Sequence, residues 1–305
     1  MIRFVLGSIP IRLFPTFARS GLSMHHPTPE EFDSLAIEHD FVPVYRRLLG
    51  DALTPVAAFR RLDQTGDQTG RSGGACLFES VIGGEKVGRY SFLASEPTLR
   101  FAAFRNEVTV TDLTGRQPER KFTDPDPLNA FRVYFEKSVA QLDGLPPFVG
   151  GAIGYAGYDV VRYVEHLPDE PEDDRGLPDL DFAFYHTLCV FDHVDKTITV
   201  VSLADCRDVE ERGQAEVAYN EATQSIDQTI ERVSGKTDSP TMETDAWDEE
   251  VWKAAAADEP LEISSNFTRE TFRQAVLDCV EYIRAGDIFQ VVPSQRLSVK
   301  TDVDP

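Results

Sequence analysis

The chain has 305 residues, of which 41% are apolar, and this is enough for packed cores in about two domains. Its 52 acidic and 30 basic residues give a net charge of −22, which repels nucleic-acid phosphates, so we expect no nucleic-acid partner. No apolar run reaches the roughly 18 residues of a membrane-spanning helix, so we expect no membrane segment. The cysteines form no C-x-x-C pair and are typical of reduced thiols in a cytoplasmic protein; they are Cys76, Cys189, Cys206 and Cys279.

The first 29 residues contain three arginines and no acidic residue. A signal peptide is poorly supported, because Gly7, Ser8 and Pro10 interrupt the apolar stretch. An organellar transit segment fits this composition better. We favour a third interpretation, in which Met24 is the natural start and residues 1–26 are an N-terminal extension.

Capping and turn signals predict the first elements of the chain. Thr54 followed by Pro55 predicts a helix over residues 55–62, and the doubled Asp-Gln-Thr-Gly within residues 63–74 predicts a flexible loop. Strand-like segments follow at residues 76–81 and 89–94, joined through Gly83-Gly84, and then a hairpin over residues 99–113 that turns near Asn106.

Further along, helices and strands are mixed. Asp126-Pro127 predicts a helix to about Leu142, and residues 182–203 predict two β-rich segments joined by a turn at residues 192–196. Residues 209–233 repeat apolar side chains at helical spacing, namely Ala215, Ala218, Ala222, Ile226 and Ile230. Strands clustered with long helices, without regular β-α-β alternation, predict an α+β fold of β-sheet layers covered by helices.

A polar, acidic segment divides the chain. Residues 234–265 carry almost no aliphatic side chains and predict a linker between an N-terminal domain over residues 27–233 and a second domain that begins with residues 266–305.

The last 38 residues predict one helix, one turn and one strand. Thr268 is placed to cap the helix and Gly286 to end it, and its apolar face comprises Phe272, Val276, Cys279, Val280 and Ile283. The five residues after Lys300 cannot supply hydrogen-bond partners for a new strand. We therefore expect the chain to be the truncated beginning of a larger protein.

The glycine-rich run Gly150-Gly-Ala-Ile-Gly-Tyr-Ala-Gly157 raises the question of a dinucleotide site. It lacks the Gly-x-Gly opening, and no acidic residue follows a second strand about twenty positions on, so we favour a structural role, in which the glycines let a strand approach its neighbour closely. Asp159 and Arg162, three residues apart, predict a local ion pair.

Four blocks of the sequence resemble the chorismate-utilising enzymes in order and spacing. This family includes anthranilate synthase component I, aminodeoxychorismate synthase component I, and the isochorismate and salicylate synthases. The blocks are Phe41–Arg47 with Thr54–Val56, Leu77–Ser80 with Gly88–Phe92, Pro147–Arg162, and Glu281–Arg296. Residues 27–32 also look like the family's usual opening, which supports a start at Met24.

The resemblance, which is nearest to the anthranilate synthase version, implies a lyase that converts chorismate and ammonia to anthranilate and pyruvate in tryptophan biosynthesis. It implies a glutamine amidotransferase subunit, anthranilate synthase component II, as the source of ammonia, and Mg²⁺ held by residues beyond Pro305. The fragment alone is then expected to be inactive. The alternatives are aminodeoxychorismate synthase component I of the folate pathway and a non-catalytic protein that binds tryptophan or a glutaminase.

A carboxylate, a hydroxyl and a guanidinium on neighbouring strands could hold an amino-acid zwitterion, with Glu79 on the ammonium, Ser80 beside it and Arg89 on the carboxylate. Spacing alone favours an ordinary exposed strand pair instead. The resemblance implies the tryptophan feedback site here, and we extend this candidate effector site to Tyr90 and Ser91.

Gln290 occupies the position at which the isochorismate-forming relatives carry a lysine that activates water. Because glutamine is not a general base, the resemblance implies that Gln290 selects ammonia as the nucleophile. The alternative is a glutamine that is simply hydrogen-bonded in a strand. Pro293 lacks an N–H group, so it must lie at an edge, a bulge or a gap in the ladder.

Overall fold

The computed structural model describes residues 24–63, 74–79, 88–168, 170, 172–211, 213–235 and 262–300. They fall into two compact units, divided between Thr237 and Asp238. Residues 64–73 of the predicted loop, the Gly83-Gly84 connection, Ser80 and most of the linker lie outside the described residues. The predicted domain bounds remain predictions, and each unit is described by itself.

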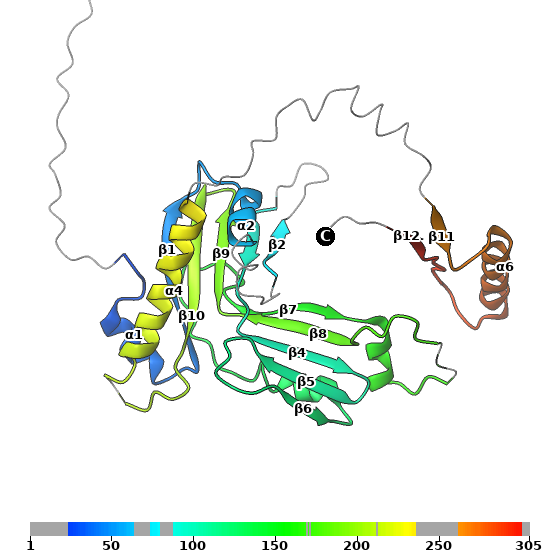
Figure 1. Cartoon of the computed structure of the whole chain (residues 1–305), viewed down its shortest axis with the longest axis horizontal. Helices are drawn as coiled ribbons and strands as arrows, with labels where there is room; N and C mark the ends of the chain where they lie inside the picture. Colours follow the sequence, from blue (N-terminus) through cyan, green and yellow to red (C-terminus); the bar gives the residue numbers. More distant parts are fainter. Residues whose placement is uncertain are drawn as a thin grey trace, which may run out of the picture. The chain divides into compact units, whose positions relative to one another are not determined.

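The first unit contains two five-stranded antiparallel sheets (Figure 1). Sheet A has the order β1-β10-β9-β3-β2, with the bounds β1 Phe41–Leu49, β10 Thr197–Asp205, β9 Thr187–Asp192, β3 Tyr90–Ala94 and β2 Cys76–Glu79. Sheet B has the order β6-β5-β4-β8-β7, with the bounds β6 Arg120–Thr123, β5 Glu107–Asp112, β4 Leu99–Phe104, β8 Leu180–Tyr185 and β7 Gly151–Ala156.

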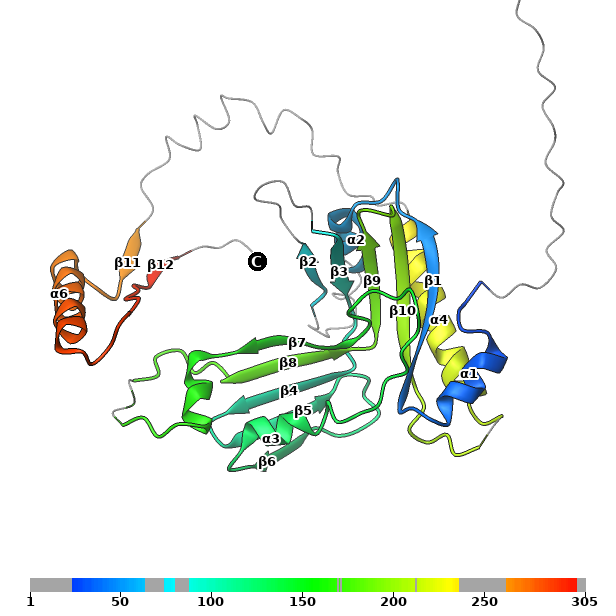
Figure 2. The ribbon, with the colours of Figure 1, turned by 180° about the vertical axis from the view of Figure 1, so that it is seen from behind.

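Three helices cover one face of sheet A, as Figures 1 and 2 show from opposite sides. They are α1 Pro29–Ala36, α2 Pro55–Asp63 and α4 Glu216–Ser234. The apolar stripe of α4, with Ala222, Ile226 and Val233 buried, packs with Phe32 of α1 and Leu93 of β3 in one core. Each helix has a single apolar face, and packing against the sheet buries it.

A second core lies on the opposite face of sheet A, where it meets sheet B. Leu188, Val190 and Val201 of sheet A cluster there with Tyr185 and Ile153 of sheet B. A third core joins sheet B to the short helix α3 Pro127–Arg132 and to the 3₁₀ helix η2 Tyr158–Tyr163. Adjacent residues of β3 thus point into different cores, as the alternation of side chains along a strand requires.

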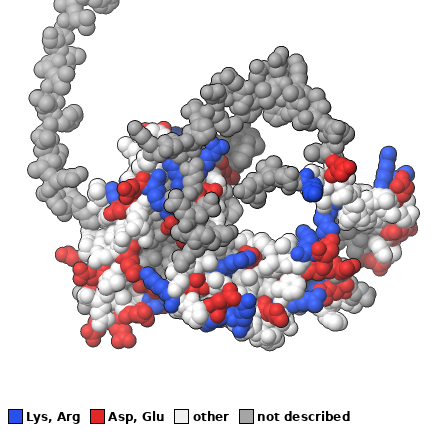
Figure 3. Space-filling model, in the orientation of Figure 1, with Lys and Arg blue, Asp and Glu red and all other residues white. Residues whose placement is uncertain are grey.

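Charged side chains of both signs are interspersed over the face of the molecule in Figure 3. Most of the ion pairs use arginine, for example Arg100 with Asp181 at 2.5 Å and Arg105 with Glu170 at 2.9 Å. The predicted pair of Asp159 and Arg162 is confirmed, with 2.8 Å between Oδ1 and Nε.

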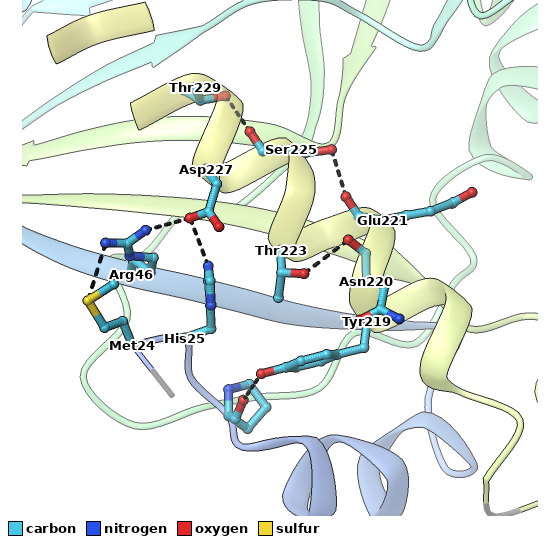
Figure 4. A network of polar contacts seen from close by, with 11 residues as sticks. Met24, His25, Arg46, Tyr219, Asn220, Glu221, Thr223, Ser225, Asp227 and Thr229 are labelled. Carbon is cyan, nitrogen blue, oxygen red and sulfur yellow. Dashed lines mark hydrogen bonds and ion pairs between the residues drawn. The ribbon is translucent and has the colours of Figure 1, made fainter. Parts of the chain in front are cut away.

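Residues 24–28 are fastened to α4 and to the outer edge of β1 (Figure 4). The carboxylate of Asp227 on α4 binds His25 at 3.0 Å and also Arg46 of β1. His26 exchanges two backbone hydrogen bonds with Tyr45, at 2.7 and 2.9 Å. This segment therefore closes part of an edge that would otherwise present unpaired backbone groups.

The helix predicted over residues 55–62 is confirmed as α2, and Thr54 Oγ1 accepts a hydrogen bond from Ala57 N at 3.2 Å. The hairpin that turns near Asn106 is confirmed as β4 and β5. The predicted α+β class is confirmed by the two sheets and their helical cover.

Other predicted bounds are wrong. The helix predicted from Asp126 to Leu142 ends at Arg132, because Ser138 and Ala140 bond instead to the backbone of Phe41 at the start of β1. Residues 209–215 precede α4 rather than belong to it, since Gly213 has a left-handed φ of 87° and the Gln214 side chain accepts the N–H groups of residues 210 and 211.

The turn predicted at residues 192–196 is confirmed between β9 and β10, but the first of the two predicted β-rich segments over residues 182–203 is divided into two strands, β8 and β9. The chain leaves sheet B at Tyr185 and enters sheet A at Thr187, so that His186 is the one residue between β8 and β9. The pattern of apolar residues continues through this junction, and therefore it gives no signal that the chain changes sheets.

The second unit contains β11 Ile263–Ser265, α6 Arg269–Ala285 and β12 Leu297–Val299. The predicted helix ends are confirmed: Thr268 Oγ1 accepts from Thr271 N at 3.2 Å, and Gly286 has a left-handed φ of 84°. Residues 287–296 form no strand, and only Leu297–Val299 pairs, with β11. Pro293 lies in this irregular segment, as its missing N–H group requires.

Candidate functional site

The predicted effector residues lie at one end of β2 and β3, on two different faces of sheet A. Glu79 is opposite Ser91 in the register, whereas Tyr90 is opposite Asp192 of β9. Directly paired residues share a face. Ser91 therefore faces the helices together with Glu79, and Tyr90 faces sheet B together with Asp192.

An apolar hollow of about 340 Å³ lies on the sheet B side. It is lined by side chains of both sheets, namely Phe78, Phe92, Phe148, Ala152, Ile153, Gly154 and Phe182. The rings of Phe92 and Phe148 meet edge to face, with 5.9 Å between their centroids. None of the lining residues is charged, so the hollow suits an apolar or aromatic group, and its volume is within the usual range of small-molecule sites.

Two glycines of the run at residues 150–157 bring the wall of this hollow together. A Cβ atom on Gly154 would lie 2.0 Å from the backbone oxygen of Asp181, and one on Gly150 would lie 2.4 Å from Leu203. Among the described residues, the glycine run forms β7 at the edge of sheet B and the residues next to it, and the missing Cβ atoms let this strand lie close to its neighbours. The predicted structural role of the glycines is confirmed.

Arg89 reaches the same side of sheet A. Its Nε and Nη2 donate to Oδ2 of Asp192 at 2.9 and 2.8 Å, and Nη2 also donates to Oδ2 of Asp195 at 2.9 Å. The hydrogen bond to Asp192 raises the pKa of the Arg89 guanidinium. Burial raises the pKa of Asp192, but Arg89 and the backbone N–H groups of Asp195 and Val194 outweigh burial, so this pKa lies below its ordinary value.

On the helix side, Ser91 is buried, and its hydroxyl contacts Nε2 of His193 at 2.7 Å. Glu79 is exposed at the end of β2, and Ser80 lies outside the described residues. The structure therefore places Arg89 and Tyr90 on the side of sheet A that bears the hollow, although neither lines it, and places Glu79 and Ser91 on the other face.

Several residues of the site were not identified from the sequence. Asp192 and Asp195 belong to the predicted turn over residues 192–196, and their carboxylates could have been considered as partners of Arg89. The phenylalanines Phe148 and Phe182 carried no signal, because an aromatic side chain next to or within a strand is usually a core residue.

Gln290 lies in the second unit, where it is exposed within the irregular segment over residues 287–296. It is not part of a strand, so the alternative of a glutamine bonded in a strand ladder is wrong. Its predicted role in selecting the nucleophile stays a prediction.

No group of three or more histidine, cysteine, aspartate or glutamate residues is placed to hold a metal ion in the part of the chain that the structure describes. The described residues therefore assign no ligands to the expected Mg²⁺. Within the same residues, no helix combines the length and the apolar character needed to cross a membrane.

The α+β fold of this chain, with its two sheets, is similar to that of a protein whose structure has been solved. Anthranilate synthase component I from Streptococcus pneumoniae TIGR4 matches the fold with a TM-score of 0.54 and 27% identity, over 85% of this chain and 50% of that chain. The sequence model of the chorismate binding enzymes matches residues 85–305. The chain belongs to this family of chorismate binding enzymes.

Curated relatives point to one branch of the family. The chain is 35% identical over 285 residues to anthranilate synthase component 1 of Acetivibrio thermocellus, which is 92% of this chain and 53% of that protein. It is 33% identical, over 311 aligned positions including gaps, to the chloroplastic anthranilate synthase alpha subunit 1 of Oryza sativa subsp. japonica, and the alignment covers 94% of this chain and 52% of that protein. The chain spans about half the length of the curated relatives it matches.

Proposed function

We propose that this chain is part of an anthranilate synthase component I, which converts chorismate and ammonia to anthranilate and pyruvate in the cytoplasm. The observation that carries the proposal is the identity of 33–35% to anthranilate synthases over more than nine-tenths of the chain. The ammonia would come from a glutamine amidotransferase subunit, and Mg²⁺ would assist the reaction. Gln290 would favour ammonia over water, because its amide cannot withdraw a proton from water.

We further propose that the hollow between the two sheets binds the indole ring of tryptophan as a feedback effector. Four phenylalanine rings surround it, and Arg89 lies beyond Tyr90 on the same side of sheet A. An apolar hollow with a cation on the same side of the sheet suits an aromatic amino acid, since the ring would be desolvated and the carboxylate paired. Ser80 would complete the site around the amino group, whereas Glu79 faces the helices and would act only through its neighbour Ser80.

A fusion tests the catalytic proposal. The half of the Acetivibrio thermocellus protein that this chain does not match would be joined after Pro305, and the fusion supplied with chorismate, ammonium and Mg²⁺. Fluorescent anthranilate is expected from the fusion and not from either half alone. Aminodeoxychorismate in place of anthranilate would support the folate enzyme, and neither product from a folded fusion that binds tryptophan would support the non-catalytic alternative.

The effector proposal predicts the behaviour of Ser80→Ala in the same fusion. Tryptophan inhibition should weaken by about fivefold or more while the uninhibited rate stays close to that of the parent fusion, because a contact made only by the effector is lost. Inhibition curves at fixed chorismate would measure this. An unchanged inhibition constant would show that β2 and β3 are an ordinary strand pair with no role in binding the effector.

A further inference from the structure

The ion-pair cluster of Arg89, Asp192 and Asp195, here called the Arg89 cluster, lies along a row of aromatic rings that leads from the hollow. The Arg89 guanidinium carbon is 5.0 Å from the centroid of the Tyr90 ring. The Tyr90 ring is in turn 6.0 Å from that of Phe92, which lines the hollow. The Tyr90 ring therefore contacts both this cation and a ring that lines the hollow.

The two carboxylates hold Arg89 unequally. The Asp192 side chain is only 11% exposed; its Oδ2 accepts two N–H groups of Arg89, and its Oδ1 accepts the backbone N–H groups of Val194 and Asp195 at 2.9 and 3.0 Å. The Asp195 side chain is 60% exposed and accepts a single hydrogen bond from Arg89. Water competes for an exposed pair of this kind, which makes the bond of Asp195 to Arg89 the weaker one.

Arg89 also has unused donor capacity. Within the described residues, its Nη1 group has no hydrogen-bond partner, and its Nη2 group is shared between the two aspartates. A carboxylate binds a guanidinium best through two parallel hydrogen bonds. A ligand carboxylate would obtain both, on Nη1 and Nη2, when Asp195 gives up its bond, while Asp192 keeps Arg89 in place through Nε.

We propose that Asp195 competes with a ligand carboxylate for Arg89 and so sets the affinity of the hollow for an aromatic amino acid, whereas Asp192 is a positioning residue for Arg89. This inference rests on the proposed effector site. It assigns to Asp195 a role opposite to that of an ordinary binding residue, because its removal strengthens binding.

The test titrates the chain with L-tryptophan and with L-tryptophanamide, which lacks the carboxylate, by isothermal titration calorimetry. Asp195→Asn should bind L-tryptophan about two- to fivefold more tightly, as expected for the loss of an exposed competing pair. Arg89→Gln should bind it about tenfold or more weakly. Neither substitution should change the affinity for the amide. The matched control for Asp195→Asn is Glu107→Gln in the β4–β5 hairpin. It also removes one negative charge, but at a position outside the Arg89 cluster.

A double-mutant cycle without ligand tests the unequal hold on Arg89. The coupling of Arg89→Gln with Asp195→Asn in the unfolding equilibrium constant should be below about fivefold, and smaller than the coupling with Asp192→Asn. Equal couplings, or an Asp195→Asn affinity no higher than that of the control, would overturn the inference while the effector site stands. If neither the parent chain nor any variant binds either ligand, the proposed effector site is wrong, and the inference about Asp195 fails with it.

Discussion

Gly154 shows how closely the structure fixes a single residue of the hollow. A Cβ atom there would lie 2.0 Å from the Asp181 oxygen and 2.6 Å from the Phe182 Cα, and both of these are backbone atoms that cannot turn aside. We expect Gly154→Ala to lower the free energy of unfolding by about 1–3 kcal/mol, because β7 must shift away from β8. Urea denaturation measures this change. Gly74→Ala is the control, since its Cβ would meet nothing within 4 Å, and equal losses in the two variants would contradict the close packing.

At Gln290 the prediction concerns chemistry and requires the catalytic fusion. A lysine in its place would put an amine beside the reacting ring, and a lowered pKa would let that amine activate water. We expect Gln290→Lys to yield a hydroxylated product, detected by chromatography, at the expense of anthranilate. A variant that makes anthranilate at the parent rate with no hydroxylated product would show that Gln290 has no role in choosing the nucleophile.

At the scale of the element, local signals predicted what local forces decide. The cap at Thr54, the left-handed Gly286 and the turn near Asn106 are set by neighbouring residues, and all three were predicted correctly. The helix after Asp126 is shorter than predicted, and the strand after Gly286 begins only at Leu297, because partners distant in the sequence decide both: β1 takes the backbone of residues 138–140, and β11 pairs with residues 297–299 only.

The contact between Asp40 and Ser138, which lies where the helix after Asp126 was predicted to continue, should be sensitive to acid. Ser138 donates to Oδ2 of Asp40 from its backbone N–H at 2.8 Å and from its hydroxyl at 2.9 Å, and in this order these bonds lower the pKa of Asp40. A lowered folded-state pKa means that the unfolded chain takes up this proton first. The stabilisation is therefore present above the ordinary carboxyl pKa of about 4 and is lost as the pH falls below it.

We expect Asp40→Asn to be less stable than the parent at pH 7 and to lose less stability between about pH 5 and pH 2, as measured by urea denaturation at each pH. Asp51→Asn is the control, because the Asp51 carboxylate accepts no hydrogen bond from any described residue. If the free energy of unfolding fell in parallel with pH for Asp40→Asn and the parent, the bonds from Ser138 to Asp40 would contribute nothing to the loss of stability in acid.

For the whole molecule, the net charge of −22 is the strongest electrostatic property. Acidic side chains repel one another in the compact state, and salt weakens this repulsion as the screening length falls from about 10 Å at 0.1 M to about 3 Å at 1 M. We expect the melting temperature to rise when potassium chloride is raised over this range. The chloride salt is chosen because sulfate would stabilise most proteins by exclusion from their surface. A melting temperature that falls or stays constant would show that the pairs of Arg89, Arg100 and other arginines already balance the charge.

The candidate site could be predicted from the sequence only in part, and the reason also lies at this scale. Motif and spacing identified β2 and β3 and named Arg89 and Tyr90, which lie on the side of sheet A that bears the hollow. They could not show that sheet B supplies Phe148 and Phe182, because the hollow exists only where two sheets meet. Nor could they show that Asp192 and Asp195 already hold Arg89, since that contact spans about a hundred residues of sequence.

The pairing of β1 with β10 also affects how the chain is made. Phe41 pairs with Asp205 and Leu49 with Thr197, so the ribosome must add roughly 150 residues after β1 before its partner exists. At 5–20 residues per second, this delay lasts on the order of 10 s. Throughout that time Val42 and Val44, which are fully buried in the finished fold, have no sheet to cover them. Among the described strands, β1 is therefore the first to be synthesised and one of the last to be paired, and we expect its apolar residues to stay exposed for most of translation.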